Sequence, residues 1–286
     1  MTLAVAASRR TVLAVLVLYG RKPDEAASWS TLLALLGQDG PLRLDHCVVH
    51  DNSPERHVPT IAPASNISVR WTPDNSGTAG AYIEAAHVAR AHGCEWLLLL
   101  DQDTDLPADY LNRAAHALDD QPDASVLVPK VRHGGELVSP ATIGRTGSVQ
   151  PTACPTAHAG IPTAISSGII MHHTAFAAVL PFPRAIWLDY VDHWMFLSFA
   201  RRGLRMGFID ADLSHDLSIR TPHTLSTTRL AGILAAENAF NDAMSDGGRG
   251  WLRLRRLIRA IRYAANGQFG HAGTVIRYTL PRATLS

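Results

Sequence analysis

Short apolar segments alternate with stretches of helical periodicity over the first two thirds of this chain, and most of the apolar segments end in polar turn residues. Buried strands are predicted at residues 11–18, 44–50, 67–71 and 96–100, with helices between them at 24–36 and 81–92. This alternation predicts a doubly wound, mostly parallel α/β sheet flanked by helices. Such a sheet binds its ligands at the carboxyl ends of the strands.

The rest of the chain continues this pattern and then becomes helical. Further helices are predicted at residues 106–118, 175–180 and 190–202, and further strands at 125–129, 168–172 and 206–209. The stretch 133–162 is rich in Gly, Pro, Ser and Thr, which predicts an excursion or a mobile flap. We therefore expect a main α/β domain over residues 1–224 and a helical C-terminal extension over 225–286.

Composition limits the kind of protein that this chain forms. Its 286 residues are 47 % apolar and 18 % charged, which suits a packed globular protein large enough to be an enzyme. The net charge of +1 creates no field that attracts nucleic acid, so no nucleic-acid partner is expected. The chain has three widely spaced cysteines, Cys47, Cys94 and Cys154, which predicts a cytoplasmic protein. It has no apolar run of about 18 residues, so no membrane-spanning helix is expected.

Two carboxylates follow the apolar strand at 96–100. Asp101 and Asp103 flank Gln102, so both side chains can point into the crevice beyond the sheet. Mg²⁺ and Mn²⁺ bind carboxylate oxygens and keep sites for phosphate oxygens, so the pair suits a metal-bound diphosphate. The alternative is a solvated turn ahead of the next helix, since Asp is common in turns. The spacing alone leaves both interpretations open.

Five short motifs occur in an order that resembles a known family. The strand ending in Leu-Leu-Asp-Gln-Asp-Thr is preceded by Val-Val-His-Asp-Asn-Ser near residue 50 and by Asn-Ser-Gly-Thr-Ala-Gly-Ala near residue 75. Ser-Ser-Gly at 166–168 and Trp-Leu-Asp-Tyr-Val-Asp at 187–192 follow. Together these motifs resemble family 2 glycosyltransferases of the GT-A fold. The Asp-Gln-Asp form is most similar to the bacterial rhamnosyltransferase branch.

The resemblance implies a role for each matching residue. The implied donor-binding residues are Asp51, Asn52, Asn75, Gly77, Gly80, Asp101, Gln102, Ser167 and Gly168. The implied ligands of Mn²⁺ or Mg²⁺ are Asp103, Asp101 and His215. Asp192 is implied as the general base that removes the acceptor proton, with Asp189 as the second candidate. Turn roles for Asp51 and Asn52, and a helix-capping role for Asp192, are the structural alternatives.

The activity implied by the resemblance is inverting transfer of a sugar from a nucleotide diphosphate donor to an acceptor hydroxyl. The rhamnosyltransferase branch implies rhamnose from dTDP-rhamnose, and a glycan or lipid-linked acceptor in cell-surface glycan synthesis. A UDP-hexose or UDP-galactofuranose donor is an alternative. Trp194 and Ser198 stand where relatives often carry Glu and Arg, so a nucleotide-sugar-binding or glycan-binding module without turnover is a further alternative.

The C-terminal extension contains a basic amphipathic segment. After Asp246 the chain carries eight arginines and no acidic residue, and Trp251, Leu254, Ile258 and Ile261 recur at helical spacing among them. Such a helix lies either on an anionic membrane, here the inner face of the plasma membrane, or against the main domain with its apolar stripe inward and its arginines in solvent. We expect the second arrangement.

Overall fold

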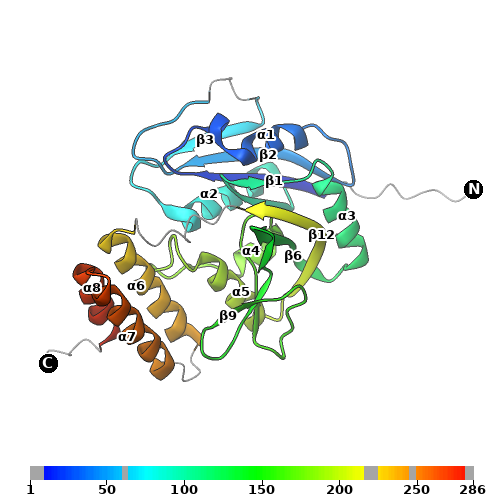
Figure 1. Cartoon of the computed structure of the whole chain (residues 1–286). Coiled ribbons are helices and arrows are strands. Elements are labelled where there is room, and N and C mark those ends of the chain that lie inside the picture. The colour runs from blue at the N-terminus through cyan, green and yellow to red at the C-terminus, as the bar shows by residue number, and fades with distance from the viewer. Residues whose placement is uncertain (1–9, 60–63, 216–224, 245–248, 281–286) are drawn as a thin grey trace, which may run out of the picture.

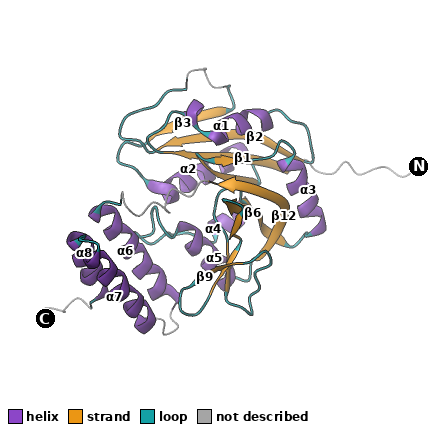
Figure 2. Ribbon diagram, in the orientation of Figure 1, coloured by secondary structure: helices purple, strands orange, loops and turns teal. Residues whose placement is uncertain are grey.

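The computed structural model describes residues 10–59, 64–215, 225–244 and 249–280. A central mixed sheet carries helices on both faces, and a group of C-terminal helices lies beside it (Figures 1 and 2). In spatial order its strands are β3 (Ile67–Trp71), β2 (Leu42–Asp51), β1 (Arg10–Leu18), β4 (Trp96–Asp101), β11 (Ile170–His172), β6 (Ala124–His133), β12 (Arg205–His215) and β5 (Thr104–Asp105). β7 (Glu136–Ser139) pairs with β6 off this path.

The half of the sheet that starts at β3 is parallel. β2 pairs in parallel with β3 and β1, and β1 pairs in parallel with β4. β11 is antiparallel to both of its neighbours, β6 and β12 are parallel, and the short β5 is antiparallel to β12. The predicted α/β class with a helical C-terminal region is confirmed. Because β2 and β4 run in the same direction, the polar residues at their carboxyl ends lie at the same end of the sheet.

Strand β1 is buried on both faces because its apolar run supplies alternate side chains to two hydrophobic cores. Val12, Ala14 and Leu16 belong to one core, while Leu13 and Val15 belong to the other. The first core is closed by α1 (Ala27–Leu35), which follows the short 3-10 helix Pro23–Glu25, and by α3 (Tyr110–Asp120). The second is closed by α2 (Gly77–His92), α4 (His173–Ala177) and α5 (Val191–Arg201).

Within the segment at 133–162, which was predicted to be an excursion or a mobile flap, β7 still pairs with the main sheet. The residues after β7 leave that sheet and form further strands. β8 (Ala141–Ile143), β9 (Val149–Pro151) and β10 (Ile161–Thr163) form a small antiparallel sheet with β8 in the middle. Ile143 is buried in the second core, which anchors this small sheet beneath α5. Strands of three residues joined by Gly- and Pro-rich turns are too short to give a clear period-2 pattern in the sequence.

Three helices form the C-terminal region: α6 (Thr227–Met244), α7 (Arg249–Ala265) and α8 (Phe269–Thr279). α8 packs against both α6 and α7 (Figure 1). α6 places Ala236 and Phe240 in the second core of the α/β region, and a separate small core joins the three helices to one another. The boundary at residue 224 stays a prediction. Among the described residues, none of the helices is both long enough and apolar enough to cross a membrane.

Candidate active site

The turn from Asp101 to Thr104 is held from two sides by buried serines. The hydroxyl of Ser28, on α1, contacts the carbonyl oxygen of Asp101, lies 2.7 Å from that of Thr104, and accepts a hydrogen bond of 3.2 Å from the Thr104 amide. The Oγ atom of Ser167 accepts from the Asp101 amide at 3.0 Å. The Oδ1 atom of Asp103 is buried. The two aspartates therefore stand on a backbone whose geometry is fixed by the core.

Tyr82 supports the Ser166–Gly168 segment that lies against this turn. Its side chain is fully buried on α2 and its hydroxyl donates to Ser166 Oγ at 2.8 Å. Burial raises the pKa of the Tyr82 phenol well above its ordinary value, and the negative charges of Asp101 and Asp192 raise it further. The Tyr82 phenol is therefore neutral, and its hydrogen bond holds Ser166, the residue before the Ser167 that contacts Asp101.

Gly168 is required by packing. Its φ is +84°, and a Cβ atom there would lie 2.6 Å from Leu213 Cδ1 and 3.0 Å from Pro129 Cγ. The hydroxyl of Tyr110 also donates to its carbonyl oxygen. The backbone after Ser167 can therefore follow its course only where residue 168 has no side chain.

Asp51 and Asn52, at the end of β2, have their hydrogen bonds satisfied within the fold. Asp51 is buried and its two carboxylate oxygens accept from the amides of Ser53 at 3.0 Å and His57 at 2.9 Å. Asn52 Oδ1 accepts from the Ser76 amide at 3.0 Å, and its Nδ2 donates to the carbonyl of Gly77 at 3.2 Å. Asn52 thereby joins the loop before α2 to the end of β2. This agrees with the turn role that is the alternative to donor binding, and direct contact with the donor stays a prediction.

The loop before α2 touches the segment that precedes α5. Asn75 has a φ of +51° and its Oδ1 accepts from the Gly77 amide at 3.0 Å. Gly77 has a φ of +68°, and a Cβ atom there would lie 2.2 Å from the carbonyl oxygen of Trp187. A Cβ at Gly80 would lie 2.4 Å from Ser76 Cβ in its present position. Gly77 thus allows a close approach between the predicted donor loop and the predicted catalytic segment, and Gly80 leaves room for Ser76.

Gln102 connects the Asp101–Asp103 turn with the loop that follows β1. Its Oε1 accepts a hydrogen bond from the Tyr19 amide at 3.0 Å. Three loops therefore gather at the carboxyl ends of β1, β2 and β4, as the parallel arrangement of these strands requires.

The two candidates for the general base have different surroundings. Asp189 forms an ion pair with Arg229 of α6, in which Arg229 Nη2 lies 2.7 Å from Asp189 Oδ1 and Arg229 Nη1 contacts Oδ2. Asp192 lies in the first turn of α5 and is half-buried. It does not cap the helix, because Tyr190 occupies the N-cap position with a φ of +64°. The geometry therefore favours a positioning role for Asp189, and the role of Asp192 as the general base stays a prediction.

Tyr190 is also in contact with the C-terminal region. Burial, together with the neighbouring Glu237 carboxylate on α6, raises the pKa of the Tyr190 phenol. A left-handed conformation is uncommon for an aromatic residue and is kept only where the surroundings enforce it. α6 thus supports the segment before α5 at two points, Arg229 and Glu237, neither of which has a signal in the sequence.

His215 comes next to the Asp101–Asp103 turn through strand pairing. β12 pairs with β5 so that residue 215 lies opposite Thr104. The His215 side chain lies outside the described part of the structure, so its predicted role as a metal ligand stays a prediction.

The donor set suits a metal that arrives together with a diphosphate. In the described part of the chain, no group of three or more His, Cys, Asp and Glu side chains could hold a metal ion. Mg²⁺ sites commonly use one or two carboxylates and complete their shell with water and substrate phosphates. Asp101 and Asp103 supply carboxylates of this kind at a strand end. The residues present fit such a partly open site.

The fold is that of GT-A glycosyltransferases. A structure of GalNAc-T7 with UDP, GalNAc and Mn²⁺ is similar over 87 % of this chain, with a TM-score of 0.57 and 11 % sequence identity, and this chain spans 51 % of it. A structure of S. aureus TarS 1-349 is similar over 94 % of this chain and 91 % of that one, with a TM-score of 0.50 and 14 % identity.

The family model described as glycosyl transferase family 2 matches residues 15–170, more than half of the 286 residues, and the chain belongs to this family. No curated protein matches the chain by sequence. The matched span includes the predicted donor loops and the Asp101–Asp103 turn, whereas Asp189 and Asp192 lie beyond it.

Proposed function

We propose that this chain transfers a sugar from a nucleoside diphosphate to an acceptor hydroxyl with inversion at the anomeric carbon. The observation that carries the proposal is the Asp101–Asp103 turn at the carboxyl end of β4, whose backbone is held by Ser28 and Ser167. Membership of glycosyl transferase family 2 supports it, as does the similarity in fold to GalNAc-T7, whose structure contains UDP and Mn²⁺.

In the proposed reaction, the acceptor oxygen forms a bond to the anomeric carbon while the bond from that carbon to the diphosphate oxygen breaks. The leaving diphosphate takes the electron pair, and the Asp192 carboxylate takes the acceptor proton. Asp189, held by Arg229, orients the segment that carries Asp192. The loops that contain Asp51, Asn52, Asn75, Gly77 and Gly80 enclose the donor nucleotide.

Asp103 and Asp101 would hold Mn²⁺ or Mg²⁺, with His215 as a further ligand, and the ion would supply positive charge to the leaving diphosphate. Ser28 and Ser167 keep the backbone of this turn in place. Gln102 holds the turn against the loop after β1. The residues that fix the turn thus contribute preorganisation, so that little reorganisation of the site is needed on binding.

For the sugar, the Asp-Gln-Asp form of the motif favours rhamnose from dTDP-rhamnose, with a UDP-hexose or UDP-galactofuranose as the alternative donors. The acceptor would be a glycan or lipid-linked glycan on the cytoplasmic side of the plasma membrane.

The alternative of a module without turnover rests on the departures at Trp194 and Ser198, and both residues have structural roles. The Trp194 indole donates to the Val179 carbonyl at 3.1 Å and Ser198 is 4 % exposed, so both side chains are used in packing.

The proposal is tested by thermal unfolding with dTDP, UDP and GDP, each with and without Mn²⁺ or Mg²⁺. A ligand that binds only the folded state raises the melting temperature by mass action. We expect a metal-dependent shift with one nucleotide that Asp103→Asn abolishes. Asp210→Asn is the matched control, because the Asp210 side chain is 97 % exposed. The absence of a shift with every nucleotide would contradict the donor site. A shift without turnover of any sugar nucleotide would support the binding module.

A further inference from the structure

Helix α7 is turned so that an arginine faces the protein and apolar side chains face outward. Every fourth residue on the inner side is buried: Leu252, Arg256 and Ala260 are 6 %, 2 % and 4 % exposed. On the opposite side, Trp251, Leu254, Ile258 and Ile261 are 48 %, 46 %, 43 % and 68 % exposed. The expected inward direction of the apolar stripe is therefore wrong, whereas Arg253, Arg259 and Arg262 are exposed as expected. We call these four residues, with the 45 % exposed Leu257, the outer face of α7.

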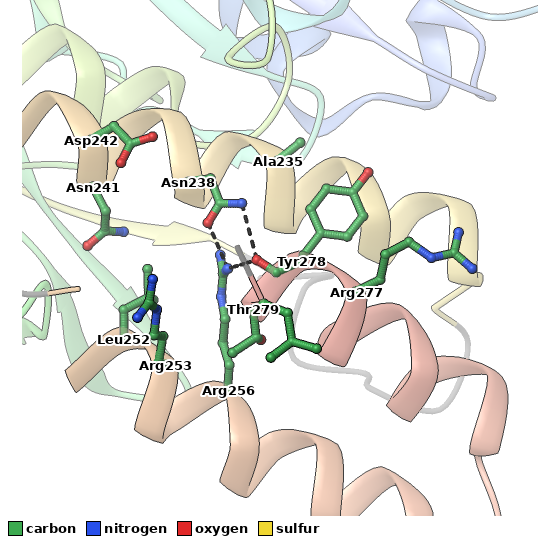
Figure 3. A pocket seen from close by; sticks show the side chains of 11 residues that line it. Ala235, Asn238, Asn241, Asp242, Leu252, Arg253, Arg256, Arg277, Tyr278 and Thr279 are labelled. Atoms are coloured by element: carbon green, nitrogen blue, oxygen red, sulfur yellow. Dashed lines mark hydrogen bonds between the residues drawn. The ribbon is translucent and has the colours of Figure 1, made fainter. Parts of the chain in front are cut away.

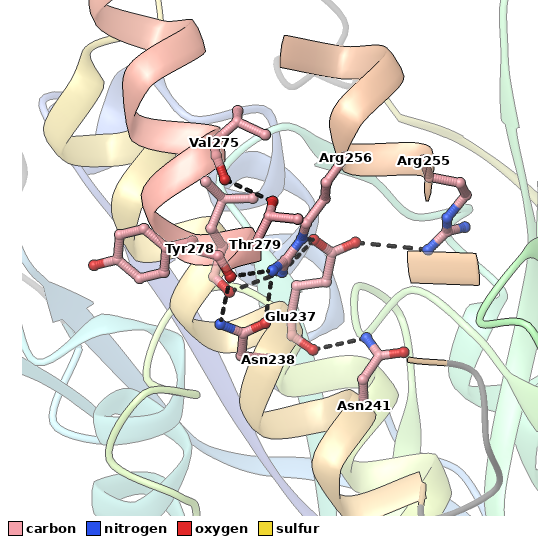
Figure 4. Close-up of polar contacts among 9 residues, drawn as sticks. Glu237, Asn238, Asn241, Arg255, Arg256, Val275, Tyr278 and Thr279 are labelled. Carbon is pink, nitrogen blue, oxygen red and sulfur yellow. Dashed lines mark hydrogen bonds and ion pairs between the residues drawn. The ribbon is translucent and has the colours of Figure 1, made fainter. Parts of the chain in front are cut away.

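This orientation is fixed by the hydrogen bonds of Arg256 (Figure 4). Its Nε and Nη2 atoms donate to Glu237 Oε2 at 2.9 and 2.7 Å, and Nη2 also donates to the Leu234 carbonyl at 3.1 Å. Its Nη1 atom donates to Asn238 Oδ1 at 2.7 Å and to the Tyr278 carbonyl at 2.8 Å. All five N–H groups are thus used, and they join α7 to α6 and α8. α7 cannot rotate its outer face inward without breaking this set.

The surroundings of the outer face are positively charged. Arg253 and Arg262 are exposed on its two flanks, and the chain has no acidic residue after Asp246. Arg253 and Arg277 also line a hollow of about 620 Å³ between α6, α7 and α8 (Figure 3). On α8, Phe269 is 74 % exposed. The region therefore combines exposed apolar side chains with cationic ones, as helices that lie in a membrane interface do.

We propose that the outer face of α7 binds the surface of an anionic lipid bilayer, with its apolar side chains among the acyl chains and its arginines at the phosphates. The arginines complement a negative surface, and the apolar side chains are then buried. A second copy of this chain suits the face less well, because two such faces would bring arginines together without any carboxylate between them. The proposal goes beyond the proposed transfer reaction and does not depend on its donor.

The test is flotation of the full chain with vesicles of phosphatidylcholine alone or mixed with phosphatidylglycerol. We expect binding only to the mixed vesicles, weakened by salt. Ile258→Gln with Ile261→Gln should lower the partition coefficient by about tenfold or more, since both side chains lose apolar burial. Arg253→Gln with Arg262→Gln should also weaken binding to the mixed vesicles. Leu33→Gln is the matched control, because Leu33 is 41 % exposed on α1.

Each result decides for or against the proposal. Loss of binding in the isoleucine variant but not in the control, with unchanged thermal unfolding, supports it. Equal binding of all variants to the mixed vesicles would overturn it, because only general charge attraction would then remain. No binding to either kind of vesicle would also overturn it. If sedimentation then showed a dimer that the isoleucine variant loses, the face would join two copies. None of these readouts involves a nucleotide, so they are separate from the test of the donor site.

Discussion

Asp189 and Arg229 form a bidentate ion pair between the segment before α5 and the first turn of α6. The Asp189 side chain is 12 % exposed and that of Arg229 34 % exposed, so the pair is largely shielded from solvent. Both carboxylate oxygens of Asp189 are therefore held by one guanidinium group, which fixes the segment before α5 to α6. The pair gives Asp189 a structural role that the sequence alone does not indicate.

The first prediction concerns these two aspartates. Asp192→Asn should lower kcat by roughly 10²–10⁴-fold, the usual contribution of a general base, and leave the nucleotide-induced shift in melting temperature intact. Asp189→Asn should lower kcat less, and Arg229→Lys should resemble it, because lysine cannot make the bidentate pair. Steady-state kinetics with the donor found by thermal unfolding provides the measurement. A larger loss in Asp189→Asn than in Asp192→Asn would reverse the two roles.

The second prediction compares two glycines with nearly the same φ. Gly77 and Gly93 have φ values of +68° and +69°, so alanine is strained at both. A Cβ at Gly93 meets nothing within 4 Å, whereas one at Gly77 meets the Trp187 carbonyl at 2.2 Å. Gly77→Ala should therefore lower the free energy of unfolding by about 1–3 kcal/mol more than Gly93→Ala. Urea denaturation measures the difference, and equal losses would show that the contact with Trp187 is easily relieved.

The third prediction concerns the buried ion pair in the C-terminal region. Arg256→Ala leaves the Glu237 side chain, 5 % exposed, without its main counter-charge and should lower the free energy of unfolding by about 3–5 kcal/mol. Arg253→Ala, at an exposed position of the same helix, should change it by less than about 0.5 kcal/mol. Replacing both members of the pair, Arg256→Met with Glu237→Met, should recover much of the loss. If Arg256→Ala were as stable as Arg253→Ala in urea denaturation, the pair would not hold α7.

The fourth prediction is a dependence of stability on pH. The His193 ring packs against Tyr190 and Phe240, and burial lowers its pKa from 6.5 to about 4. Between these values the unfolded chain binds the proton and the folded chain does not, so stability falls as pH drops from about 6.5 to 4, by up to about 3 kcal/mol. His193→Phe keeps an aromatic ring and should flatten this part of the profile. His87→Phe, at an exposed position on α2, should leave the profile unchanged.

Much of the α/β fold follows from local sequence patterns. An apolar run such as residues 11–18 predicts a strand buried on both faces, and β1 covers Arg10–Leu18. The position of Asp101 at a strand end is equally local, because it depends only on where the apolar run at 96–100 stops. The small sheet at 141–163 was not foreseen as strands, because segments of three residues carry too little periodicity.

The sequence by itself therefore determined the long strands of the main sheet, most of the helices, and the aspartates and glycines that follow the strands, since these depend on neighbours along the chain. Only the tertiary structure decided which of these groups meet. Arg229 reaches Asp189 across 40 residues, and no local pattern encodes that contact. Helical spacing likewise defined an apolar stripe on α7 but not the direction in which it points. That direction was set by Glu237, because a buried carboxylate needs a buried cation and Arg256 is the one that α7 supplies.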